Sequence, residues 1–78
     1  MNAIKITNKT INRFYEMASI NWAEDKEAQR QAMNNAFGAA TMMSDFLWDK
    51  GLHDKAKEIE NLWENEWRPK FVKLIWGA

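Results

Sequence analysis

Apolar residues recur every three or four positions along most of the chain, which is the spacing of an amphipathic helix. The first such stripe consists of Ile11, Phe14, Tyr15, Ala18 and Trp22. The second is mostly alanine and consists of Ala28, Ala32, Ala36, Ala40, Met43 and Leu47. The third consists of Ala56, Ile59, Leu62, Trp63 and Trp67. We therefore predict an all-α bundle with three main helices, near residues 8–20, 22–50 and 54–67.

The start of the first helix is predicted from its polar residues. Ile4 and Ile6 alternate around Lys5, so residues 1–6 are interpreted as an extended lead-in whose isoleucines dock on the helices. Thr7 or Asn8 is then the expected N-cap, because an oxygen of either side chain can accept a hydrogen bond from a free backbone amide.

The second helix has recognisable start and stop signals. Asn21 and Glu24 have the spacing of a capping box, and Gly51 is expected to end the helix in the left-handed conformation. The alanine stripe predicts close packing against the first helix or against a second copy of the chain, since small side chains let helix axes approach. Gly38, inside this helix, is expected to permit a tight crossing or a local bend.

The segment from Asp49 to Ala56 resembles the inter-helix turn of a tetratricopeptide repeat, although no second repeat is present. The resemblance implies an antiparallel hairpin of the second and third helices around Gly51. Pro69 then interrupts the third stripe, which leaves two possibilities: a kinked helix, or a short fourth helix near 70–76 with proline in its first turn. The second is favoured here.

Composition narrows the class of protein. With 78 residues the chain is expected to form one domain over 1–78, and eleven basic residues balance eleven acidic ones. A net charge of zero argues against general nucleic-acid binding. The sequence contains no cysteine, no apolar run of membrane-spanning length and no signal-peptide core, so we expect a cytoplasmic protein.

Candidates for catalysis or metal binding are few. His53 is the only histidine, and its position in a predicted turn beside Asp54 favours a solvated or capping role. No activated nucleophile and no pair of metal ligands at a characteristic spacing accompanies it. We therefore expect no catalytic residues, no metal, no cofactor and no enzymatic activity.

The tryptophans are the most informative residues, because five of them exceed what a small core needs. Trp63 and Trp67 lie on the third stripe and are predicted to be core residues. Trp48 lies off its stripe and Trp76 lies near the end of the sequence, so both are predicted to be exposed. Exposed tryptophan, methionine and arginine are typical of interface hot spots.

Residues 21–67 carry ten acidic and five basic residues, a net charge of minus five, between basic ends. This asymmetry fits either internal charge complementarity or an acidic face that meets a basic partner. Glu60 and Glu64 share one helical face, where like charges repel unless something offsets them. The predicted partner-binding residues are Trp48, Trp76, Met42, Glu60, Glu64 and Arg68.

The preferred hypothesis is a non-enzymatic protein-binding module that inhibits or modulates a larger partner by occupying its surface. Its size and composition are typical of the accessory proteins of phages and mobile elements, including those that block host defence. The apolar excess also predicts a homodimer, with the second helix and the C-terminal aromatics as its seam. The alternative is a sequestering protein that holds a nucleotide or another flat ligand through Trp63, Trp67, Arg68 and Lys70.

Overall fold

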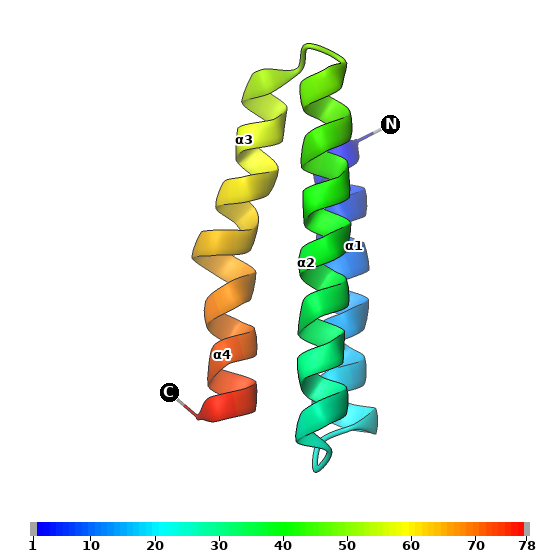
Figure 1. Ribbon diagram of the computed structural model, residues 1–78, viewed down its shortest axis with the longest axis vertical. Helices are drawn as coiled ribbons and strands as arrows, with labels where there is room; N and C mark the ends of the chain where they lie inside the picture. Colours follow the sequence, from blue (N-terminus) through cyan, green and yellow to red (C-terminus); the bar gives the residue numbers. More distant parts are fainter. Residues whose placement is uncertain (1, 78) are drawn as a thin grey trace.

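The computed structural model describes residues 2–77, and every regular element in that range is helical. The chain forms α1 (Ala3–Glu16), α2 (Lys26–Asp49), α3 (His53–Leu62) and α4 (Arg68–Trp76). Two π-helical turns, Met17–Asn21 and Trp63–Trp67, extend α1 and join α3 to α4. Three rods therefore lie side by side in an elongated bundle of 41 × 22 × 16 Å, with α1 and the α3–α4 rod both antiparallel to α2 (Figure 1). The predicted all-α bundle is confirmed.

The first helix begins at Ala3, five residues earlier than predicted. The prediction of an extended lead-in before it is therefore wrong. Asn2 is the N-cap, and its side chain accepts a hydrogen bond from the Lys5 amide at 3.1 Å. Thr7 lies inside the helix, where its hydroxyl donates to the Ala3 carbonyl at 2.7 Å. This bond lets a threonine occupy a buried position of the apolar stripe, so the helical period continues back to Ala3.

The second helix begins at Lys26, so the capping box predicted at Asn21 is also wrong. Asn21 belongs to the π-helical turn that ends the first rod. Asp25 is the N-cap instead, and its carboxylate accepts a hydrogen bond from the Ala28 amide at 3.1 Å. Residues 22–25 are the whole connection, which places the two helices next to each other.

The hairpin between α2 and α3 forms as predicted around Gly51, which has φ of +78°. The Leu52 amide donates to the Leu47 carbonyl at 2.9 Å, and the Gly51 amide donates to the Trp48 carbonyl at 3.0 Å. These two bonds form a Schellman motif, which satisfies the last carbonyls of α2. Gly38 makes no tight crossing, because a β-carbon added there would meet nothing within 4 Å.

The short final helix is present, but it is not separate from α3. Trp67 and Arg68 keep right-handed helical dihedrals, and the Arg68 amide donates to the Trp63 carbonyl, five residues back. Pro69 lies in the first turn of α4, directly after this wider π-helical turn. The wider turn accommodates a residue that lacks an amide hydrogen and crowds the preceding carbonyls.

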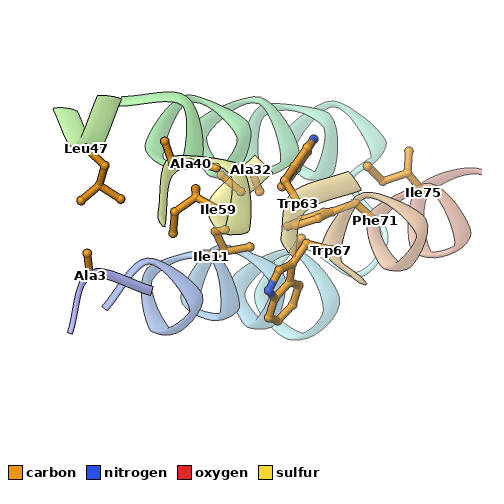
Figure 2. Close-up of a cluster of buried hydrophobic side chains, with 13 residues drawn as sticks. Ala3, Ile11, Ala32, Ala40, Leu47, Ile59, Trp63, Trp67, Phe71 and Ile75 are labelled. Atoms are coloured by element: carbon orange, nitrogen blue, oxygen red, sulfur yellow. The ribbon is translucent and has the colours of Figure 1, made fainter. Parts of the chain in front are cut away.

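The core lies where the three rods meet, and Figure 2 shows its main side chains pointing toward one another. Ala32, Ala36 and Ala40 of α2 are buried between the other two rods, as the alanine stripe predicts. The remaining large contributions come from Ile11, Leu47, Ile59, Trp63, Trp67, Phe71 and Ile75. Trp63 and Trp67 are buried, which confirms their predicted place in the core.

Candidate functional site

The two predicted surface tryptophans are exposed, but they lie at opposite ends of the bundle. Trp48 is 49% exposed beside the α2–α3 hairpin, where its ring stacks on His53 with centroids 4.0 Å apart. Trp76 is 54% exposed at the end of α4, and the Arg30 guanidinium lies 6.0 Å from its ring centroid. The hairpin and the C-terminus are at the two ends of the long axis (Figure 1). One compact patch cannot contain both indoles.

Glu60 and Glu64 do come together with other side chains, in a cleft of about 340 Å³ between α2 and α3. We call this the α2–α3 cleft; its lining residues are Phe37, Ala40, Thr41, Ser44, Asp45, Glu60, Trp63 and Glu64. Phe37 is 51% exposed, and its ring centroid lies 5.5 Å from that of Trp63 at an angle of 51°. An aromatic pair therefore adjoins three carboxylates, and the lining residues include no basic side chain.

Hydrogen bonds and one ion pair hold the α3 side of this cleft. The Ser44 hydroxyl lies 3.3 Å from Glu60 Oε1 and 3.3 Å from the Ala56 carbonyl oxygen, so it can donate to either. Arg68 Nη1 lies 3.6 Å from Glu64 Oε2, and both side chains are exposed. A solvated pair of this kind contributes well under about 1 kcal/mol. Arg68 thus offsets part of the repulsion between Glu60 and Glu64.

Met42, the other predicted contact residue, lies on a different side of α2. It is 75% exposed and lines an apolar groove of about 480 Å³ between α1 and α2. We call this the α1–α2 groove; its lining residues are Ile6, Thr7, Thr10, Ala39, Met42, Met43 and Phe46. None of these side chains is charged. At one edge Lys50 Nζ lies 5.5 Å from the Phe46 ring centroid.

The residues of the ligand-binding alternative are occupied by internal contacts. The Trp67 indole nitrogen donates to Asn8 Oδ1 at 2.7 Å, and Lys70 Nζ lies 4.6 Å from the Trp67 ring centroid. Trp63 packs between Phe37 and Phe71. Since both indoles are buried, neither offers an open face for a flat ligand.

Sequence reasoning did not single out Phe37 or Ile6 as surface contacts. Phe37 was detectable, since Phe37, Thr41 and Trp48 follow one another at helical spacing along one side of α2. Ile6 was not detectable, because its place opposite Phe46 follows from α1 starting at Ala3 and from how α1 packs on α2.

Two further findings concern site chemistry and membranes. Within residues 2–77, no group of three or more histidine, aspartate or glutamate side chains is arranged to hold a metal ion. In the same range, no helix combines the length and the apolar character that crossing a membrane requires. Comparisons with family models, with curated proteins and with solved structures give no match for this chain.

Proposed function

We propose that this chain is a non-enzymatic protein-binding module that inhibits or modulates a larger partner by occupying its surface. The observation that carries the proposal is the α2–α3 cleft, where exposed Phe37 packs on buried Trp63 beside Asp45, Glu60 and Glu64. Phe37 is not part of the buried core, so folding alone does not account for an aromatic side chain at this position. Exposed aromatic residues beside a polar rim are typical of binding hot spots.

The chemistry of the cleft favours a basic segment on the partner. A lysine or arginine side chain can lie against the aromatic rings while its charge pairs with the carboxylates. Three carboxylates with one neighbouring arginine leave the cleft negatively charged, which favours encounter with a basic surface. Trp48 lies on the same side of α2 as Phe37 and extends this surface toward the hairpin.

The experiment compares the tagged wild type with two double variants in pull-downs from a bacterial host lysate. Cross-linking then tests whether a captured protein contacts the chain directly. Glu60→Gln with Glu64→Gln removes two charges from the cleft. Glu58→Gln with Glu66→Gln removes two charges from the same rod, on the side that faces Ile4 of α1. We expect the first variant to lose the captured partner and the control to retain it. Capture of nothing by the wild type, or equal capture by both variants, contradicts the proposal.

The biological role, the cellular location and the self-association of the chain are proposals as well. As an accessory protein of a phage or mobile element, the chain would block a host defence or transcription protein in the cytoplasm. The α2–α3 cleft would be its contact surface. No observation favours the flat-ligand alternative, because Trp63 and Trp67 are core residues. Self-association of the chain belongs to a different surface, the α1–α2 groove.

A further inference from the structure

The α1–α2 groove exposes an apolar surface that the monomer leaves open. Ile6, Met42 and Phe46 are large apolar side chains that are all exposed around it. Toward the other end of the same helix pair, a second hollow is lined in part by Phe14, Met17, Ala28 and Asn35, with the carboxylates Asp25 and Glu27 at its α2 edge. The two hollows together follow most of the length of α1, on one side of its contact with α2.

The spacing of the lining residues is that of a helix-packing seam. On α1 the positions Thr7, Thr10, Phe14 and Met17 are separated by three, four and three residues. On α2 the positions Asn35, Ala39, Met42 and Phe46 are separated by four, three and four. Alternating steps of three and four are the repeat by which helices pack along their whole length. The surface therefore suits a pair of helices better than an extended segment.

The area of this surface is close to the area that a specific dimer interface buries on each copy. With the π-helical turn, the first rod spans Ala3–Asn21, which corresponds to roughly 28 Å, and two neighbouring helices present a face about 20 Å wide. The face therefore measures on the order of 600 Å² on each copy, near the lower end of specific interfaces.

The uncharged lining of the α1–α2 groove favours a second copy of this chain over a charged foreign helix. A two-fold axis juxtaposes one patch with itself, and the α1–α2 groove, unlike the second hollow, carries no charge that this would bring against its own copy. With the axis parallel to the helices, α1 of each copy lies antiparallel to α2 of the other.

We propose that two copies of this chain associate through the α1–α2 groove to form an antiparallel four-helix bundle with Ile6, Met42 and Phe46 in the seam. The proposal does not depend on the α2–α3 cleft, which lies on another side of α2. It also moves the seam expected from the sequence, since Trp76 lies at the end of α4 and takes no part.

Sedimentation equilibrium of the full chain tests this proposal. We expect the wild type to have the mass of two chains at micromolar concentration. Met42→Glu buries a carboxylate in the seam, and we expect it to raise the dissociation constant at least about tenfold. Ile6→Glu, on the other helix, is expected to do the same. Both positions are exposed in the monomer, so far-ultraviolet circular dichroism should show unchanged helix content.

Phe37→Glu is the matched control, because it places the same charge at an exposed aromatic position of α2 outside the groove. We expect it to leave the dimer intact. A wild type that sediments as a single chain overturns the proposal. Equal weakening by Phe37→Glu and Met42→Glu overturns it too, since the seam would then not be the groove.

Discussion

Gln29 shows how one buried polar side chain joins two rods. It is 1% exposed, and its Nε2 donates to the Ala18 carbonyl at 3.0 Å and to the Ala23 carbonyl at 3.3 Å. Carbonyls at the end of a helix have no partner within that helix. The first turns of α2 thus supply the hydrogen bonds that the end of the first rod lacks. The Gln29 Oε1 atom is buried without a hydrogen-bond partner, so the site retains an energetic cost.

We predict that Gln29→Ala lowers the free energy of unfolding by about 2 kcal/mol, because two carbonyls lose their donor and a cavity opens. Urea titration followed by circular dichroism measures the change. Gln31→Ala is the control, since it makes the same substitution at an exposed position two residues away. A loss no larger than that of the control would show that water replaces the glutamine without cost.

Gly38 and Gly51 illustrate opposite uses of glycine. Gly38 lies within α2, and a β-carbon there meets nothing within 4 Å, so Gly38→Ala should raise the free energy of unfolding by about 1 kcal/mol. Gly51 has φ of +78°, so Gly51→Ala should lower it by about 1 kcal/mol. Thermal unfolding of both variants checks the pair. A destabilised Gly38→Ala would mean that this part of α2 is contacted in a way the monomer does not show.

At the level of elements, the π-helical turn Trp63–Trp67 corrects the phase of the third rod. Ile59, Trp63, Trp67, Phe71 and Ile75 are all buried and follow one another at intervals of four. In a regular α-helix each such step passes a full turn by about 40°, so four steps rotate the stripe by about 160°. The wider turn in the middle removes much of this rotation. One rod can therefore keep a stripe of strict period four against the core.

This explanation predicts an asymmetry between losing and gaining a residue. Deletion of Asn65, which is exposed, should convert the turn to α-helix while Phe71 and Ile75 still face the core. We expect the free energy of unfolding to change by about 1 kcal/mol or less. Insertion of an alanine after Asn65 should rotate Phe71 and Ile75 by about 100° away from the core and cost about 3 kcal/mol or more. Denaturant titration distinguishes the two, and equal losses would contradict the phase argument.

Local patterns predicted most of the elements but not their irregularities. The apolar periodicity indicated all three rods, and Gly51 indicated the hairpin, because both signals depend on neighbours in sequence. The start at Ala3 was missed because the helical stripe passes through Thr7, a polar residue satisfied by its own helix. The π-helical turns were missed because apolar periodicity indicates which residues are buried and not how the backbone keeps them in phase. Periodicity alone does not contain that information.

On the scale of the whole molecule, the candidate site was only partly predictable. Periodicity shows the side of a helix on which a residue lies, and it placed Trp48 and Met42 at the surface, where both are exposed. It does not show which positions on different helices lie at the same height. The grouping of Glu60 with Phe37, and of Met42 with Ile6, therefore required the packed structure.

The position of α2 between the two surfaces has a consequence for avidity. Phe37 and Asp45 line one side of this helix, whereas Ala39 and Met42 line another. A dimer closed through the groove would therefore carry two open clefts. Each dimer could bind two partner molecules at once. On a sensor coated with partner, dissociation of the wild type should slow as coating density rises, because rebinding is intramolecular. Met42→Glu should lose this dependence on density and keep the affinity of a single cleft.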